Sequence, residues 1–261
     1  MKRTGKFIVI EGLDGCGKST QTKLLIEHLE QDGHKCKFIH FPILEQGVYG
    51  KLIAQFLRGE LKPRETIIDS VYDVHPKLVA LMYACERKEH AHIIEGWLND
   101  GYTVIADRYV CSNIAYQCAK IIYEPEKKKL REWILDLEFT VNKLPRPDKM
   151  LFLDLPRKYI ANKMLNERSG SDRDYLCGTT DIHEADTSFQ AEVYYEYMKL
   201  VDLMDDFIKN KLKNERNERK DKRLGILRFQ AVYLYDKGEN DELVYVNQLS
   251  TTDLQIHFNT N

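Results

Sequence analysis

Short apolar runs alternate with amphipathic segments along the first 155 residues of the chain. The apolar runs lie at 7–10, 35–41, 103–106 and 150–155, and their length is typical of buried strands. The amphipathic segments lie at 21–31, 48–57 and 76–99 and repeat apolar residues at helical spacing. Pro76 suits a first helical position, and Gly101 suits a helix stop. Strands separated by helices predict right-handed βαβ units, and hence a parallel sheet with helices on both faces.

The pattern after Tyr194 is less regular. Two further strand-like runs lie at 226–235 and 243–246, joined by a polar segment. They form a hairpin, or one of them supplies a fifth parallel strand. We favour 243–246 as the fifth strand, because the Ser-Thr-Thr-Asp that follows at 250–253 would then start a final short helix.

The joint between the first strand and the first helix carries the most informative motif. Residues 12–20 read Gly-Leu-Asp-Gly-Cys-Gly-Lys-Ser-Thr, which fits the pattern G-x-x-x-x-G-K-[ST]. Such a loop aims several backbone N–H groups at one point, and the helix adds the positive end of its dipole. Lys18 can reach the β- and γ-phosphates of a nucleotide, and the Ser19 hydroxyl can hold Mg²⁺. The expected ATP phosphate site is Gly12, Gly15, Cys16, Gly17, Lys18, Ser19 and Thr20; the alternative is a Gly-rich structural turn.

This loop and the strand pattern together predict the fold class α/β. We expect a P-loop NTPase-type three-layer sandwich, with a five-stranded parallel sheet covered by helices on both faces. The 261 residues suffice for one sizeable core, so a single domain over 1–261 is predicted. Ligands of such sheets bind beyond the carboxyl ends of the strands.

Composition narrows the classes of function. The formal net charge of −2 gives no general attraction to nucleic acid or to acidic membranes. No apolar run approaches about 18 residues and the first residues do not resemble a signal peptide, so neither a membrane span nor secretion is expected. The six cysteines show no C-x-x-C spacing, which favours reduced thiols and a cytoplasmic location. We interpret Cys16 as a small filler of the loop, although the positive potential there could lower its pKa.

A second polar segment follows the third predicted strand. Residues 107–117 read Asp-Arg-Tyr-Val-Cys-Ser-Asn-Ile-Ala-Tyr-Gln. Asp107 can hold Mg²⁺ directly or through water, and Arg108 can clamp a phosphate with its planar fork. On the helix that follows, Asn113 shares a face with Tyr116 or Gln117, which suits recognition of a base and a sugar. The alternative is a capped helix start with a structural Asp107–Arg108 ion pair.

These residues resemble the thymidylate kinase family, whose members carry a D-R-Y-x-x-S-x-x-A-Y-Q-like signature after the third strand. The resemblance covers about residues 5–200, and residues 205–242 exceed the family pattern as a C-terminal insertion. Besides the phosphate loop and the signature, its motifs are Phe41-Pro42, Tyr83-Ala-Cys-Glu-Arg87, Pro147-Asp148, Arg168 and Arg173.

The resemblance implies roles for the acceptor site. The Tyr83 position lies on the thymine ring and the Arg87 position binds the 5′-phosphate of the acceptor, roles that suit a flat stacking surface and a bidentate fork. The Asn113 position reads the polar edge of thymine, and the Tyr116 position crowds the sugar C2′ and disfavours ribonucleotides. The full expected thymidylate site is Asp14, Phe41, Tyr83, Arg87, Arg108, Asn113, Tyr116 and Gln117. Within it, Phe41 packs beside the base, Asp14 lies near the 3′-hydroxyl and the metal, and Gln117 supports the base site.

A mobile lid is expected at about 166–182, where glycines and small polar residues bracket two arginines. Some family members carry a catalytic arginine in the phosphate loop, where this chain has Gly15. The charge is therefore expected from the lid, with Arg173 favoured over Arg168. The expected catalytic set is Lys18, Asp14, Arg108, Arg173 and Arg168, with Ser19 and Asp107 as metal ligands.

The chain departs from the family pattern at one position. Members usually place an arginine two residues after Phe-Pro, where it helps to hold the acceptor phosphate, whereas this chain has Leu44. Either Arg87 and Arg108 suffice, or Lys51 or Arg58 substitutes.

The resemblance implies transfer of a phosphoryl group from Mg·ATP to the 5′-phosphate of thymidylate (dTMP), for dTTP synthesis, by a homodimer. One alternative is a related nucleoside monophosphate kinase with a different or broader base preference. A second is a nucleotide-binding switch that signals through a partner. A third is nucleic-acid binding through the basic run 211–223, although its interspersed acidic residues favour a solvated helix or loop. His90, His92 and Glu95 have spacing that could suit a metal, but a solvated helix face is expected.

Overall fold

A parallel sheet of five strands forms the centre of the computed structural model of the chain. The structure describes residues 3–61, 72–155, 176, 183, 187–213, 229–233, 235–237 and 243–245. The strands are β1 (Lys6–Glu11), β2 (Cys36–His40), β3 (Thr103–Asp107), β4 (Lys149–Asp154), β5 (Phe229–Tyr233), β6 (Tyr235–Lys237) and β7 (Leu243–Tyr245). The helices are α1 (Lys18–Gln31), α2 (Gly47–Leu57), α3 (Pro76–Asn99), α4 (Val110–Cys118), α5 (Glu124–Asp136), the π-helical turn η1 (Leu137–Val141) and α8 (Thr187–Lys213).

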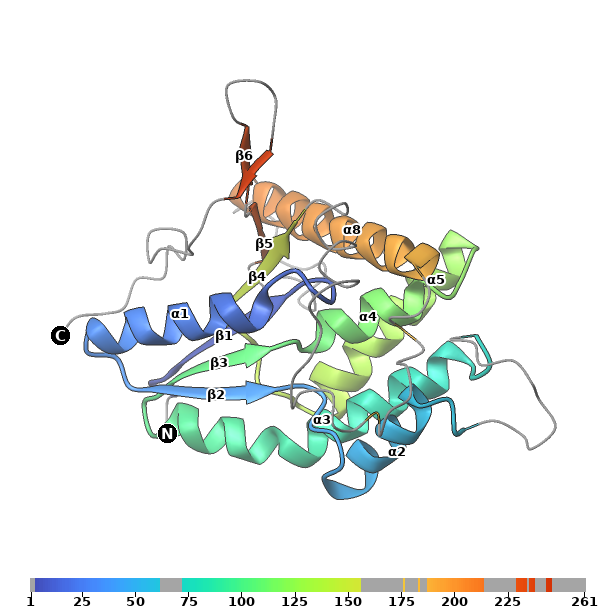
Figure 1. The fold of residues 1–261 in the computed structure, drawn as a ribbon, viewed down its shortest axis with the longest axis horizontal. Coiled ribbons are helices and arrows are strands. Elements are labelled where there is room, and N and C mark those ends of the chain that lie inside the picture. Colours follow the sequence, from blue (N-terminus) through green and yellow to red (C-terminus); the bar gives the residue numbers. More distant parts are fainter. Residues whose placement is uncertain are drawn as a thin grey trace.

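The strand order β2-β3-β1-β4-β5 places the phosphate loop at the middle of the sheet. Because the chain crosses the sheet in opposite directions after β1 and after β2, right-handed crossovers put α1 and α3 on opposite faces. The later crossovers run in the same direction as the one through α3, so α4 and α8 share its face and pack against one another (Figure 1). In the register of the sheet, Ile10 of β1 lies opposite Asp107 of β3, so the two polar segments begin side by side.

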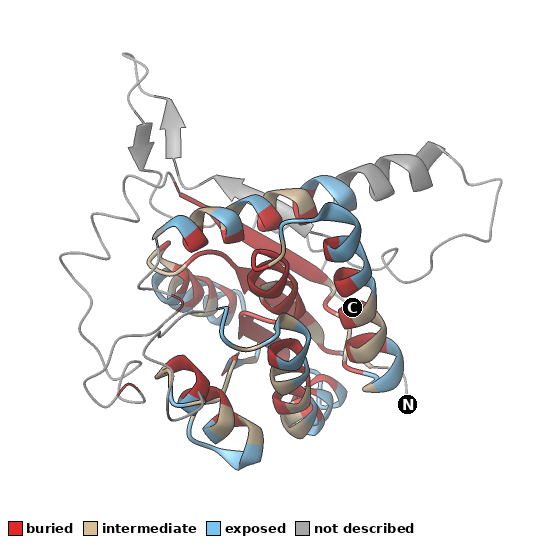
Figure 2. Ribbon diagram, turned by 90° about the vertical axis from the view of Figure 1, so that its right-hand side faces the viewer, coloured by how far each residue is buried: buried red, intermediate tan, exposed pale blue. Residues whose placement is uncertain are grey.

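The core lies between the sheet and these helices. The side chains of β1, β3 and β4 are almost completely buried, which is expected of parallel strands covered on both faces. α4 is buried almost throughout, whereas helices such as α1 and α3 bury one face and expose the other (Figure 2). Within the described part of the chain, no helix combines the length and the apolar character needed to cross a membrane.

The first four predicted strands and the helix starting at Pro76 are confirmed. The His75 side chain accepts a hydrogen bond from the backbone N–H of Lys77 and so caps that helix. The helix ends at Asn99, and Gly101 follows with a φ of 82°, the left-handed conformation predicted for a glycine stop.

The predicted fifth strand is wrong. Residues 229–233 form β5, which pairs in parallel with β4, and Leu243–Tyr245 pairs antiparallel with β6 in a separate hairpin. The connection between β6 and β7 is too short for a parallel crossover, which needs about a dozen residues or more, so these two strands pair antiparallel. The connection through α8 is long enough for the parallel pairing of β5 with β4. The helix α5 and the turn η1 were not predicted. The helix expected from 250–253, and residues 214–223 of the basic run, lie outside the described residues.

Candidate active site

The phosphate loop runs from the end of β1 to the start of α1. Gly17 precedes α1 with a φ of 89°, a conformation that residues with a Cβ seldom adopt. Gly12 must also be glycine, because a Cβ there would lie 2.6 Å from the Cys16 sulfur and 3.1 Å from the carbonyl oxygen of Leu153. The Lys18 ammonium group donates hydrogen bonds to the carbonyl oxygens of Gly12 (3.2 Å) and Leu13 (2.8 Å), so it lies across the loop.

Cys16 fills the inside of this loop. Its side chain is 1% exposed, and burial raises the pKa of the thiol even though the Lys18 and Arg108 charges act in the opposite direction. The lowered pKa that the positive potential could produce is therefore not found. A buried thiol with a raised pKa is a poor nucleophile and supports the filler role.

A cavity of about 1240 Å³ opens beside the phosphate loop, at the carboxyl ends of the strands. Every residue of the expected thymidylate site lines it, as do both expected metal ligands, Ser19 and Asp107. The expected thymidylate residues come from the phosphate loop, the segment after β2, α3, and the β3–α4 segment. The volume exceeds that of most single-ligand pockets, which suits two nucleotides better than one small molecule.

Arg108 lies at the turn between β3 and α4. Its φ of 67° is left-handed and unusual for a residue with a long side chain, and its N–H is held by the carbonyl oxygen of Ile10 at 2.9 Å. One terminal nitrogen of its guanidinium, Nη2, donates to Asp14 Oδ1 at 2.6 Å, and the hydroxyl of Tyr116 donates to Asp14 Oδ2 at 2.7 Å. Burial would lower the pKa of Arg108, but the negative charge of Asp14 and its neighbours holds that pKa well above its ordinary value.

Arg87 forms a buried ion pair that the sequence did not predict. Its guanidinium pairs with both carboxylate oxygens of Glu138 on η1, and the side chains are 2% and 0% exposed. Asn113 Nδ2 donates to Oε1 of Glu138 at 3.1 Å and to the carbonyl oxygen of Ala80 at 3.0 Å. Arg87 therefore lies beside the amide expected to read the base, whereas Arg108 pairs with the phosphate loop.

Several polar atoms near this cluster have no partner within the described part of the chain. They are Asn113 Oδ1 and both amide atoms of Gln117. Both side chains are at least 98% buried and both line the cavity. Because a buried polar group without a hydrogen bond is costly, these atoms are candidates for contact with a ligand.

Aromatic rings flank the same cavity. Tyr83 lines it from α3, and Phe41 lines it from the segment after β2, packed against the ring of Tyr109 at a centroid distance of 5.7 Å. His183 also lines the cavity, with its ring 5.2 Å from that of Tyr116. His183 was not predicted, because it belongs to no motif recognised in the sequence.

Asp107 is a buried carboxylate at the wall of the cavity. One oxygen, Oδ2, lies 3.4 Å from His40 Nδ1, while the other, Oδ1, is buried and has no partner among the described residues. Burial would raise the pKa of Asp107, but His40, Lys18 and Arg108 together hold that pKa below its ordinary value. The carboxylate is therefore ionised at neutral pH.

The family model described as thymidylate kinase matches residues 10–222 of the chain. The chain belongs to the thymidylate kinase family. It is 40% identical over 168 residues to a probable thymidylate kinase of Thermococcus gammatolerans, a match spanning 63% of this chain and 72% of the relative. It is 35% identical over 202 residues to a probable thymidylate kinase of Thermococcus kodakarensis, spanning 77% and 90%. The solved structure of thymidylate kinase from Candida albicans, described as having broad substrate specificity, matches with a TM-score of 0.57 and 27% identity over 89% of this chain and 86% of that one.

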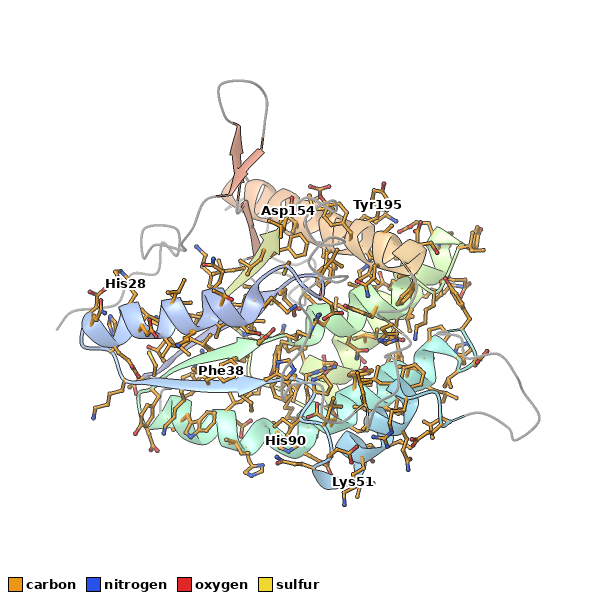
Figure 3. All side chains as sticks on the ribbon, in the orientation of Figure 1. His28, Phe38, Lys51, His90, Asp154 and Tyr195 are labelled. Carbon is orange, nitrogen blue, oxygen red and sulfur yellow. The ribbon has the colours of Figure 1, made fainter. Side chains whose placement is uncertain are left out.

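The cations considered for the missing family arginine do not lie at the cavity. Lys51 is exposed on α2 (Figure 3), and Arg58 pairs with Glu45 and Glu60, each at 2.6 Å. Neither residue lines the cavity, whereas Arg87 and Arg108 both do. The lid arginines, Arg168 and Arg173, lie outside the described residues.

Proposed function

We propose that the cavity holds thymidylate facing ATP on the phosphate loop, and that the enzyme transfers the γ-phosphoryl group of ATP to the 5′-phosphate of thymidylate. As a thymidylate kinase, the chain is an ATP-dependent nucleoside monophosphate kinase. The observation that carries the assignment of the site is the set of residues that line the cavity. One cavity joins Asp14 and Ser19 of the phosphate loop to the aromatic and amide side chains of Tyr83, Asn113 and Gln117.

The contacts of the two buried arginines support different roles for them. Arg108 pairs with Asp14 beside the phosphate loop, so we assign the acceptor phosphate and the moving phosphoryl group to Arg108. Arg87 shares Glu138 with Asn113, so we assign Arg87 to the base end of the site, in place of the phosphate role expected from the resemblance. Asn113 Oδ1, which has no partner among the described residues, can accept the N3–H of thymine, and Tyr83 can stack on the ring.

The oxygen atoms near the loop fit Mg²⁺. Asp107 Oδ1 is an unpartnered carboxylate oxygen within the described residues, and the Ser19 hydroxyl lines the same cavity. Mg²⁺ takes a few such oxygens and keeps several waters. When bound, the ion would neutralise charge on the ATP phosphates. We propose Ser19 and Asp107 as its protein ligands.

The chemistry requires placement and charge more than proton transfer. The acceptor is already an anionic phosphate, so the protein needs no general base. Lys18 and Arg108 supply positive charge, and the lid arginines, Arg173 before Arg168, are proposed to complete it. Enclosing donor and acceptor in one cavity orients them in line and excludes water, which contributes much of the rate.

An ADP-release assay tests this function. Purified enzyme with Mg·ATP is given thymidylate, deoxyuridylate, deoxyguanylate and uridylate in turn, and kcat/KM is measured for each. We expect thymidylate to be the best acceptor and uridylate the poorest, since Tyr116 crowds the ribose 2′-hydroxyl. Equal rates with all four would favour a kinase of broad base preference, and the absence of multiple turnovers with any would favour a nucleotide-binding switch.

We also propose a cytoplasmic homodimer. The cytoplasm is proposed because the described cysteines are free thiols. The homodimer is proposed because Val48, Leu78 and Leu81 expose apolar side chains on the contacting helices α2 and α3. Light scattering after size-exclusion chromatography would give twice the 30.7 kDa chain mass for a dimer. A mass equal to that of one chain would refute the assembly.

A further inference from the structure

A hydrogen-bond network of Glu11, Ser112 and Tyr197 lies beside Arg108. Glu11 is the last residue of β1, immediately before the phosphate loop, and its side chain is completely buried. Tyr197 of α8 is also completely buried, with its ring stacked on Phe152 of β4 at a centroid distance of 4.9 Å. Together with Ser112 of α4, these residues join three separate elements to the β3–α4 turn.

The two carboxylate oxygens of Glu11 have different kinds of hydrogen-bond partner. Oε1 accepts the backbone N–H of Tyr109 at 2.9 Å and of Ser112 at 3.3 Å, which caps the first turn of α4 directly after Arg108. Oε2 contacts the hydroxyl of Ser112 at 2.6 Å and that of Tyr197 at 3.0 Å. The two N–H groups can only donate, and the two hydroxyls can donate as well. These hydrogen bonds favour the ionised form of Glu11, whereas burial raises its pKa above the ordinary value.

The two hydroxyls connect this carboxylate to the guanidinium of Arg108. Nη1 of Arg108 donates to the Ser112 oxygen at 3.2 Å and to the Tyr197 oxygen at 3.5 Å, while Nη2 faces Asp14 and Tyr116. The hydroxyls also contact each other at 2.7 Å. Because Arg108 can only donate, the two hydroxyl protons serve the contacts among Ser112, Tyr197 and Glu11, so at least one hydroxyl donates to Glu11.

We propose that Glu11 and Tyr197 are positioning residues for Arg108. Glu11 orients the two hydroxyls so that their lone pairs hold Nη1, and this leaves Nη2 aimed at the phosphate loop. The same carboxylate holds the left-handed turn at Arg108 through the N–H of Tyr109. Neither side chain lines the cavity, so both act on substrate only through Arg108. This inference rests on the proposed function of Arg108 at the acceptor phosphate.

Two substitutions separate this role from simple packing. Tyr197→Phe keeps the ring and removes only the hydroxyl. Glu11→Gln keeps the shape, but its amide oxygen is needed at Oε1 for the two backbone N–H groups. The amide nitrogen must then face the hydroxyls, and it adds donors where they need an acceptor. Tyr194→Phe is the matched control, since it removes a hydroxyl of the same helix that donates to Asp154 at 3.4 Å.

Steady-state kinetics and thymidylate calorimetry test the proposal. Tyr197→Phe should lower kcat/KM for thymidylate about tenfold, and Glu11→Gln about tenfold to a hundredfold, because small misplacements of a catalytic group have effects of this size. The KM for ATP should change by less than about twofold, as should every constant of Tyr194→Phe. Unchanged kcat/KM for thymidylate in Tyr197→Phe would overturn the proposal, and Tyr197→Phe keeps the test open if Glu11→Gln does not fold.

A double-mutant cycle shows whether the effect passes through Arg108. In an Arg108→Met background, Tyr197→Phe should cause no further loss of thymidylate affinity, whereas the same fold loss in both backgrounds would overturn the inference. If the wild type neither binds nor phosphorylates thymidylate, the proposed function fails separately. The free energy of unfolding without substrate is then compared among the wild type, the two single variants and the double variant. Non-additive effects of Tyr197→Phe and Arg108→Met support the positioning contact, and additive effects refute it.

Discussion

The buried pair of Arg87 and Glu138 allows stability and ligand recognition to be tested separately. The substitution Glu138→Leu removes the carboxylate and leaves the guanidinium of Arg87, which is 2% exposed, without its counter-ion. It also removes one of the two acceptors of Asn113 Nδ2, although the carbonyl oxygen of Ala80 remains. The change should therefore act on both the core and the base end of the cavity.

The expected loss of stability follows from burial. Removing one partner of a buried ion pair costs about 3–5 kcal/mol, because the remaining charge has no partner and little water. Replacing both partners by apolar residues of similar volume is often neutral. The double variant Arg87→Met with Glu138→Leu should thus recover most of the free energy of unfolding lost by Glu138→Leu alone. It should not recover thymidylate affinity, since it lacks the guanidinium and leaves Asn113 less firmly held.

Urea unfolding and thymidylate calorimetry measure the two effects. Glu126→Leu is the control, since Glu126 pairs with Lys129 at 2.8 Å on the surface and is 52% exposed. It should lose less than about 1 kcal/mol and bind thymidylate normally. A loss below about 1 kcal/mol for Glu138→Leu would refute the buried-charge reasoning. Wild-type affinity in the double variant would refute the assignment of Arg87 to the base end.

Three further predictions use the same enzyme. Lys18→Ala should lower kcat by about 10²–10³-fold with an unchanged circular dichroism spectrum, because a preorganised charge on the phosphates is lost; normal turnover would refute the role of Lys18. Tyr83→Ala should weaken thymidylate binding by about 1–3 kcal/mol in calorimetry, the range for base stacking on an aromatic ring, with the KM for ATP unchanged. The hydrogen bond with Glu86 raises the pKa of His90, so protonated His90 should stabilise the fold below its unfolded pKa of about 6.5 and cease to do so as pH rises through the folded value. The difference in unfolding free energy between wild type and His90→Gln should accordingly be larger at about pH 5.5 than at about pH 8.5, and a constant difference would contradict this.

Local signals in the sequence sufficed for the parts of the fold that local chemistry determines. The strand before the phosphate loop, the proline that starts α3 and the glycine after it depend on neighbouring residues, and each prediction is confirmed. The fifth strand was mistaken because the choice between the two runs rested on a capping pattern at 250–253. The chain from β4 to either run is long enough for a parallel crossover, so connection length does not decide between them, although the short link after Lys237 lets β6 and β7 pair only as a hairpin.

The expected site residues converge on one cavity because they follow adjacent parallel strands or the helices beside them, and the sheet brings their carboxyl ends together. Their partners were beyond the reach of motif reading. Glu138 lies 51 positions from Arg87 and Tyr197 lies 186 positions from Glu11, and neither partner belongs to a recognised pattern. A charged residue that is buried needs a counter-charge or hydrogen bonds, but the three-dimensional packing decides which residue supplies them.

The difference in counter-ions supports the different roles that we propose for the two arginines. In the sequence alone, Arg87 and Arg108 are both cations in motifs of the same family, and nothing distinguishes their roles. In the structure, the charge of Arg87 is compensated by a carboxylate that is itself fully buried, so adding a phosphate there would place two negative groups on one guanidinium. Nη1 of Arg108 instead donates to two neutral hydroxyls, and Nη2 pairs with Asp14, a side chain that is 20% exposed at the cavity wall. An incoming phosphate can compete with Asp14 for Arg108 at little cost, whereas competing with Glu138 for Arg87 would leave a carboxylate buried without a partner. We therefore propose Arg108 as the phosphate-binding arginine, because its counter-ion Asp14 can reach water.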